Sequence, residues 1–245
     1  MRNFIFTVSY DGTRYNGWQK QGNTPNTIQE KLETLLSRLL EQEVELSGSG
    51  RTDAGVHALK QTCSFHADTT KDCAEFLAEI RRFLPEDIGA LSLEDAPDRF
   101  HARLNCKEKT YKYRIWNSEL PNIFQRRYML TYPSALDVGS MKKAAALLRG
   151  QHDFTSFCSN KRLKKSAVRE IKSIGLERLG DELCITVTAD GFLYNMVRIL
   201  VGTLLEVGTG QRDAMSVPAV LSALDRSAAG PTAPAHGLIL WEQKY

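Results

Sequence analysis

One order of strands and helices occurs twice along this chain, and that repetition constrains the fold more than any other feature. Alternating polar and apolar residues predict the strands, and apolar residues at helical spacing predict the helices. Each half has the order strand, helix, strand, strand, helix, strand, and the second half has one added helix. In the first half, the predicted strands are residues 4–10, 44–47, 61–66 and 88–93, and the predicted helices are residues 28–40 and 73–84. In the second half, the predicted strands are residues 109–116, 168–179, 183–189 and 238–241, and the predicted helices are residues 137–149, 192–207 and 217–224.

The β-α-β-β-α-β order is that of the split, ferredoxin-like unit. It predicts an α+β protein of two ferredoxin-like halves, each with a mainly antiparallel sheet that carries its helices on one face. The other face stays open, and RNA-recognition modules bind RNA on such a face. The two halves show no convincing sequence identity, so the repeat is one of topology. We predict one domain over residues 1–105 and a second over residues 106–245.

The composition is that of an ordinary globular protein. The 245 residues are 42% hydrophobic and 25% charged, which excludes a disordered chain and a disulfide-rich mini-domain. Five cysteines without a C-x-x-C pair indicate reduced thiols and a cytoplasmic protein. The five histidines form no motif such as H-E-x-x-H, so we expect no metal site. The most apolar stretch, residues 192–207, includes Asn195, Arg198 and Glu206 and is too short and too polar to cross a membrane.

Positive charge is concentrated in two segments, although the net charge of the chain is only +3. Residues 161–172 include six basic residues and one acidic residue, and residues 107–114 include four basic residues and one acidic residue. Such segments favour a polyanionic partner, with ordinary solvent-exposed charge as the alternative.

The segment Gly48–Ala58 is the most unusual in the chain because three of its first eight residues are glycines. A dinucleotide-binding loop would need a glycine where Asp53 lies, and the Gly-Lys-Ser/Thr of a Walker A loop is absent. A predicted strand follows, so no helix N-terminus is available for a phosphate. Two interpretations remain at this point: a turn in which Asp53 binds backbone amides, or a loop that carries chemistry.

Seven segments of the chain resemble, in the same order, the motifs of the bacterial tRNA pseudouridine synthase A family. The most specific is Gly50–His57, which resembles the catalytic loop of the family. The other six are Tyr10–Gln19, Phe100–Arg103, Tyr111–Tyr113, His152–Phe157, Gly191–Arg198 and Ala233–Leu238. The resemblance implies a pseudouridine-synthase-type core in which the two halves are continuous.

The resemblance also implies the reaction: isomerisation of uridine to pseudouridine at positions 38–40 of the tRNA anticodon stem-loop. This rearrangement breaks the C1′–N1 bond and joins C1′ to C5, so it needs neither a redox change nor a cofactor. It needs a nucleophile that can both add and leave, and a carboxylate suits this role. Asp53 matches the catalytic aspartate of the family. Attack on C1′, attack on C6 and initial proton removal at C2′ all remain open for it.

The family pattern assigns roles to four further residues. Arg198 would keep Asp53 ionised by lowering its pKa, with an arginine that extends to the surface as the alternative. Tyr111 would stack on the uracil and help to remove the C5 proton, whereas a core position in its strand is the structural alternative. Arg51 would contact the RNA backbone or fill the space left by the base. Leu238 would form a wall of the pocket.

A uridine in a stem must be flipped out of the helix, and contacts to phosphates would offset the cost. The family resemblance also implies a homodimer in which one tRNA contacts both subunits. Two other functions stay open: a non-catalytic RNA-binding protein that uses the open sheet faces, and a nucleotide- or phosphate-binding enzyme. The candidate RNA-binding residues are Arg14, Lys107, Lys109, Lys112, Lys161, Arg162, Lys164 and Lys165.

Overall fold

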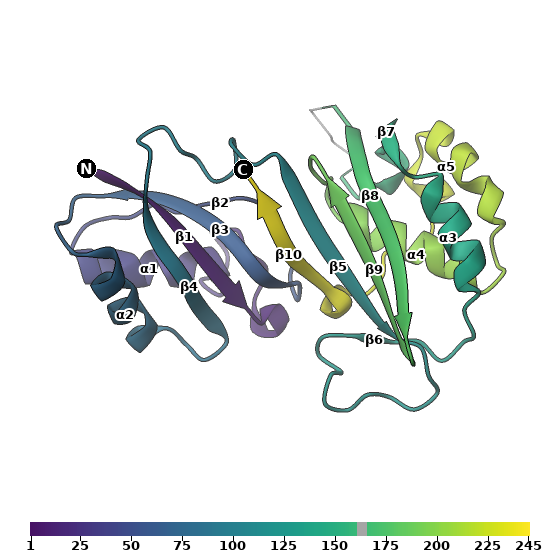
Figure 1. The fold of residues 1–245 in the computed structure, drawn as a ribbon, viewed down its shortest axis with the longest axis horizontal. Coiled ribbons are helices and arrows are strands. Elements are labelled where there is room, and N and C mark those ends of the chain that lie inside the picture. The colour runs from purple at the N-terminus through teal and green to yellow at the C-terminus, as the bar shows by residue number, and fades with distance from the viewer. Residues whose placement is uncertain (161–165) are drawn as a thin grey trace. The chain divides into compact units, whose positions relative to one another are not determined.

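The computed structural model describes residues 1–160 and 166–245, which form two compact units. Unit 1 comprises Met1–Lys107 together with Ile239–Tyr245, and unit 2 comprises Glu108–Leu238. Both units combine helices with strands (Figure 1). The predicted α+β class with mainly antiparallel strands is therefore confirmed. The units differ from the predicted domains in the last strand, because the C-terminal residues pair with a strand of the first unit.

The sheet of unit 1 has the strand order β4-β1-β3-β10, and β2 also pairs with β3. The central strand β1 is antiparallel to both β3 and β4, whereas β10 runs parallel to β3. The elements are β1 (Arg2–Tyr10), η1 (Gly12–Arg14), α1 (Ile28–Leu40), β2 (Ser47–Gly48), β3 (His57–Ala67), α2 (Cys73–Phe83), β4 (Ile88–Ala96) and β10 (Leu238–Lys244).

The core of unit 1 lies between one face of this sheet and the apolar sides of α1 and α2. Phe4, Phe6 and Val8 alternate along β1, and each is fully buried. The Thr27 hydroxyl accepts a hydrogen bond from the backbone N–H of Glu30, as the sequence predicts for a helix cap at this position.

The sheet of unit 2 has the strand order β5-β9-β8-β7, antiparallel throughout, and β6 pairs in parallel with β5. Helix α4 is almost wholly buried, and its Arg198 and Glu206 are half-buried. The elements are β5 (Glu108–Trp116), β6 (Leu130–Thr131), α3 (Val138–Ala146), β7 (Gly150–Asp153), η2 (Thr155–Phe157), β8 (Val168–Leu179), β9 (Glu182–Ala189), α4 (Met196–Gly208), η3 (Ala214–Ser216), α5 (Val217–Ala223), η4 (Arg226–Ala228) and η5 (Ala235–Gly237).

The structure corrects four details of the predicted elements. Helix α4 begins at Met196 rather than residue 192, because Asn195 before it has a left-handed backbone (φ 62°). Helix α3 ends at Ala146, three residues early, and β2 is shorter than predicted and displaced to Ser47–Gly48. Strands β6 and β7 are too short for an alternating pattern and were not predicted. Within the described part of the chain, no helix is long and apolar enough to span a membrane.

Candidate functional site

The loop that carries Asp53 connects β2 to β3 and is held by backbone hydrogen bonds to the segment that follows β1. The Thr52 carbonyl accepts a hydrogen bond from the Trp18 N–H (3.0 Å), and the Thr52 hydroxyl pairs with the Tyr10 hydroxyl (2.8 Å). The Asp53 carbonyl accepts a hydrogen bond from the Val56 N–H (3.1 Å), which closes a turn around Ala54 and Gly55. The backbone on either side of the Asp53 side chain therefore has fixed partners.

Two glycines of the preceding segment lie directly against this loop. A Cβ atom on Gly12 would be 2.0 Å from the Val56 carbonyl oxygen. At Gly17 a Cβ atom would be 2.7 Å from the Thr52 carbonyl oxygen, and the backbone there has a φ of +88°. Only glycine allows the two segments to approach this closely. The resemblance of Tyr10–Gln19 to a family motif thus corresponds to a physical requirement of the loop.

The side chains around Asp53 differ sharply in burial. His57 is buried, and its Nδ1 accepts a hydrogen bond from the Gly12 N–H (3.0 Å) and lies 3.1 Å from Asp11 Oδ1. Asp53 itself is half-buried, and Arg51 is exposed. The loop therefore places one carboxylate at the boundary between the core of unit 1 and solvent, with an exposed cation two residues away.

Tyr111 lies on β5 in unit 2, opposite Val187 of β9. Its side chain is only 6% exposed, and its ring makes an edge contact with Phe192 at 5.1 Å between ring centres. The sequence left a core role and a substrate-stacking role open for this tyrosine. The structure shows a ring that is fixed by packing, which either role requires.

Arg198 is anchored by hydrogen bonds to two neighbouring parts of unit 2. Its Nε donates to the Ala233 carbonyl (2.7 Å), and its Nη1 donates to Asn195 Oδ1 (2.9 Å). The Ala233 N–H in turn donates to the Arg198 carbonyl (3.0 Å). Half-burial of a guanidinium is favourable only with such partners. The alternative of an arginine that simply extends to the surface is not what the structure shows.

The same segment, residues 233–238, also contacts Tyr113, whose role the sequence did not reveal. The Tyr113 hydroxyl donates to the Pro234 carbonyl (2.8 Å), and a Cβ atom on Gly237 would be 2.7 Å from the Tyr113 ring. Burial raises the pKa of Tyr113 above its ordinary value, and the positive charge of Arg198 opposes this shift. Leu238, at the end of the segment, is buried. Arg198 and Tyr113 therefore both contact the segment that leads to Leu238.

Asn195 is a second residue that the sequence analysis did not single out. It precedes α4 with a left-handed backbone, and its side-chain amide donates to Ser159 Oγ (3.1 Å) while its carbonyl oxygen accepts from Arg198. One feature of the sequence could have indicated Asn195: it is a polar residue three positions before Arg198 in an otherwise apolar stretch.

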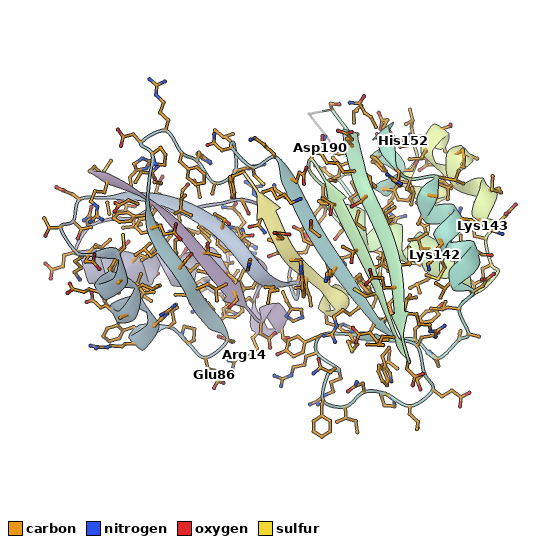
Figure 2. The ribbon with its side chains drawn as sticks, viewed as in Figure 1. Arg14, Glu86, Lys142, Lys143, His152 and Asp190 are labelled. Carbon is orange, nitrogen blue, oxygen red and sulfur yellow. The ribbon has the colours of Figure 1, made fainter. Side chains whose placement is uncertain are left out.

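The predicted RNA-binding residues are distributed over both units. Arg14 binds Asp87 (2.7 Å) and lies with Glu86 at one end of unit 1 (Figure 2), so two carboxylates surround it. Lys107 is exposed, and Lys109 and Lys112 are half-buried on β5. An RNA-binding role for all of these stays a prediction. Lys161, Arg162, Lys164 and Lys165 lie outside the described residues.

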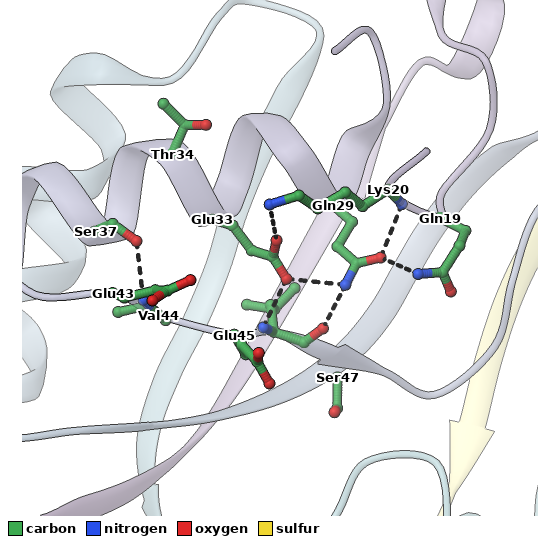
Figure 3. Close-up of a pocket in the computed structure, with 11 residues that line it drawn as sticks. Gln19, Lys20, Gln29, Glu33, Thr34, Ser37, Glu43, Val44, Glu45 and Ser47 are labelled. Atoms are coloured by element: carbon green, nitrogen blue, oxygen red, sulfur yellow. Dashed lines mark hydrogen bonds and ion pairs between the residues drawn. The ribbon is translucent and has the colours of Figure 1, made fainter. Parts of the chain in front are cut away.

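A cavity of about 680 Å³ lies elsewhere in unit 1, between α1 and residues 43–47 (Figure 3). Gln29 extends into it and donates to Glu33 Oε1 (2.9 Å) and to the Leu46 carbonyl (3.0 Å). Asp53 is not among the residues that line this cavity. Over residues 1–160 and 166–245, no cluster of three or more histidine, cysteine or acidic side chains could hold a metal ion.

Comparison with known proteins identifies the class to which this fold and these residues belong. The family model described as tRNA pseudouridine synthase matches residues 7–105 and 144–245, which include both Asp53 and Arg198. The tRNA pseudouridine synthase A 2 of Bacillus cereus (strain ZK / E33L) is 45% identical over 240 residues, which are 98% of each chain.

Two further relatives extend this result to the full length of the chain. The tRNA pseudouridine synthase A of Bacillus sp. (strain KSM-64) is 46% identical over 243 residues, with 98% of each chain covered. The tRNA pseudouridine synthase A 2 of Clostridium tetani (strain Massachusetts / E88) is 44% identical over 245 residues, with 100% of this chain and 99% of the other covered.

The chain belongs to the tRNA pseudouridine synthase family, whose members are isomerases that convert uridine to pseudouridine in tRNA. The family, the enzyme class and the tRNA substrate predicted from the sequence motifs are therefore confirmed.

Proposed function

We propose that this protein forms pseudouridine at positions 38–40 of the tRNA anticodon stem-loop, with Asp53 as the nucleophile. The observation that carries the proposal is the construction of the Asp53 loop. Its backbone is hydrogen-bonded to the segment after β1, and Gly12 and Gly17 are required for that contact. A carboxylate held in this way can be presented to a flipped nucleotide without a rearrangement of the loop. Such positioning supports covalent catalysis.

Arg198 is the proposed counter-ion of Asp53. Hydrogen bonds to Ala233 and Asn195 already fix the plane of its guanidinium. A fixed guanidinium beside a carboxylate stabilises the charged form and lowers the carboxyl pKa, so Asp53 would be ionised at neutral pH. An ionised carboxylate is the form that can attack C1′ or C6.

Tyr111 is the proposed stacking partner of the uracil, and Leu238 is a proposed wall of the pocket. Tyr111 is held by its edge contact with Phe192, and an aromatic ring is the kind of group on which a flipped base stacks. Its hydroxyl is proposed to help to remove the C5 proton. Arg51, exposed at the start of the loop, would contact the RNA backbone or replace the flipped base.

The wider arrangement belongs to the same proposal. Two ferredoxin-like halves form one core, and the protein acts as a cytoplasmic homodimer in which a single tRNA contacts both subunits. Lys107, Lys109 and Lys112 would contribute phosphate contacts, which predicts binding that weakens with salt.

The test uses an unmodified tRNA transcript with uridines at positions 38–40. Pseudouridine is mapped chemically for wild type, for Asp53→Asn and for Asp181→Asn, which removes an exposed carboxylate of unit 2. We expect Asp53→Asn to bind the transcript but to lose activity by at least about 10³-fold, because the nucleophile is gone. Asp181→Asn should keep full activity. Product formation by Asp53→Asn would remove Asp53 from the mechanism, and tRNA binding by an inactive wild type would favour the non-catalytic RNA-binding protein.

A further inference from the structure

The loop between β5 and β6 presents three large apolar side chains to solvent. Leu120, Ile123 and Phe124 are 78%, 63% and 92% exposed. The loop extends from the strands of unit 2 beside β6 (Figure 1). Single exposed apolar residues are common on protein surfaces, but three within five positions mark a surface that binds something. We call residues 120–127 the apolar tip.

The apolar tip is an ordered structure. The Trp116 indole donates to the Leu120 carbonyl (2.8 Å), and Arg114 Nη1 donates to Gln125 Oε1 (3.3 Å). The Gln125 N–H donates to the Asn122 carbonyl (3.2 Å). These hydrogen bonds fix the backbone of the loop while the apolar side chains point away from it. A preorganised tip of this kind binds a partner at a low entropic cost.

The charge of the apolar tip is positive. Arg126 and Arg127 lie two and three residues after Phe124 and are exposed, and Arg126 Nη1 donates to the Ile123 carbonyl (2.7 Å). That bond holds one guanidinium beside the Phe124 segment. The nearest acidic residue in the sequence is Glu119, and residues 120–127 include none. An aromatic ring next to guanidinium groups is the combination on which unpaired nucleobases stack and to which phosphates bind.

A second copy of this chain fits the apolar tip less well. A two-fold contact centred on the tip would place Arg126 and Arg127 of one copy against the same residues of the other. Glu119 alone would be available in the same loop to compensate this charge, and like charges across an interface are costly. The charge of the tip therefore favours a polyanion over a copy of itself.

We propose that the apolar tip binds an unpaired nucleobase of the tRNA, with Phe124 stacked on the base and Arg126 and Arg127 next to its phosphates. This inference rests on the proposed function, because it takes tRNA as the partner. The tip lies in the stretch between the two segments that the family model matches, residues 7–105 and 144–245. It would thus add a contact to those made by the shared motifs.

The experiment measures the Kd for an unmodified tRNA transcript with Phe124→Ala, Phe124→Leu and Phe124→Trp. We expect Phe124→Ala and Phe124→Leu to weaken binding about tenfold, since stacking on one base is lost. Phe124→Trp should keep wild-type affinity because tryptophan also stacks. The control is Met215→Ala, which removes another exposed apolar side chain of unit 2 (63% exposed) and should have no effect. The slope of log Kd against log salt concentration should stay unchanged in all four variants.

Leucine at position 124 separates stacking from simple apolar contact. Wild-type binding by Phe124→Leu, or by Phe124→Ala, would overturn the proposal. Sedimentation is measured in parallel: dissociation of a dimer by Phe124→Ala would identify a second copy as the occupant and would likewise overturn it. Pseudouridine formation by wild type is scored separately, so an inactive wild type counts against the proposed function, whereas an active wild type with indifferent Phe124 variants counts against the tip alone.

Discussion

The Asp53 loop and the Arg198 cluster both hold a side chain in place, but they do so by opposite means. The Asp53 loop is held through its backbone, by the hydrogen bond from the Trp18 N–H and by the close approach of Gly12. Arg198 is held through its own side chain, by the carbonyls of Ala233 and Asn195. The backbone contacts of the loop should therefore remain when the Asp53 side chain is changed. A change of Arg198 removes an anchor of the fold as well as a functional group.

Replacement of Arg198 is the strongest way to test this contrast. In Arg198→Met the Ala233 carbonyl and Asn195 lose their donor, which costs about 2–3 kcal/mol of unfolding free energy. Activity should fall by about 10²-fold or more because the proposed counter-ion of Asp53 is lost. Chemical denaturation measures the loss of unfolding free energy, and the rate of pseudouridine formation in tRNA measures the loss of activity. The matched control is Asp53→Asn, which should unfold at the same denaturant concentration as wild type. Equal destabilisation of Arg198→Met and Asp53→Asn would contradict the comparison.

Gly202 tests how far the Arg198 cluster depends on the segment after α5. A Cβ atom there would lie 1.8 Å from the Pro231 carbonyl oxygen, so Gly202→Ala must displace the segment that leads to Ala233. We expect a net destabilisation of about 1–3 kcal/mol, since the backbone clash exceeds the gain in helix propensity. The control is Gly175→Ala, because no atom lies within 4 Å of a Cβ added at this glycine. This variant should be as stable as wild type. A Gly202→Ala protein as stable and active as wild type would show that the segment adapts freely.

Gly12 provides the corresponding test of the Asp53 loop. In Gly12→Ala the added Cβ would meet the Val56 carbonyl, and we expect turnover to fall about tenfold through displacement of the loop, as small errors in position do in active sites. Gly22→Ala, where the added Cβ has no neighbour, should keep wild-type turnover. The measurement is kcat of each variant relative to wild type, compared between Gly12→Ala and Gly22→Ala. An unchanged kcat in Gly12→Ala would mean that the close approach does not position Asp53.

The smallest expected effect is a pH dependence in the segment 233–238. Burial lowers the pKa of His236 below its ordinary value, although a backbone hydrogen bond to Met129 opposes the shift. The unfolded chain therefore binds a proton at His236 more readily than the folded chain does. Stability should be constant above about pH 6.5 and should decrease as the pH falls below it. His236→Gln should flatten that part of the unfolding curve, and an unaltered slope in this variant would assign the pH dependence to other groups.

Much of the secondary structure could be predicted because it depends on neighbours in sequence. The limits of β8 at Val168–Leu179 agree with the alternating pattern, and α1 begins where Thr27 caps it. The start of α4 could not be predicted, because the left-handed backbone at Asn195 is maintained by contacts to Ser159 and Arg198. Strands as short as β6 have no pattern of their own, and their pairing depends on the partner strand.

The candidate site divides in the same way. Its chemical groups, Asp53 and Arg198, could be named from motifs because the motifs are short and specific. The supports of those groups could not. Tyr113 reads as an ordinary core residue of a strand, yet its hydroxyl binds the Pro234 carbonyl across 121 positions of the chain.

The sequence by itself determined the family, the candidate reactive groups and most of the order of the elements, because each of these depends on residues that lie close together along the chain. Only the tertiary structure decided that the last strand, β10, pairs with β3 of unit 1 and that Arg198 is tied to Ala233. This strand pairing and this hydrogen bond depend on contacts between segments that are distant in the sequence. A local pattern of residues does not predict which distant segments will be in contact.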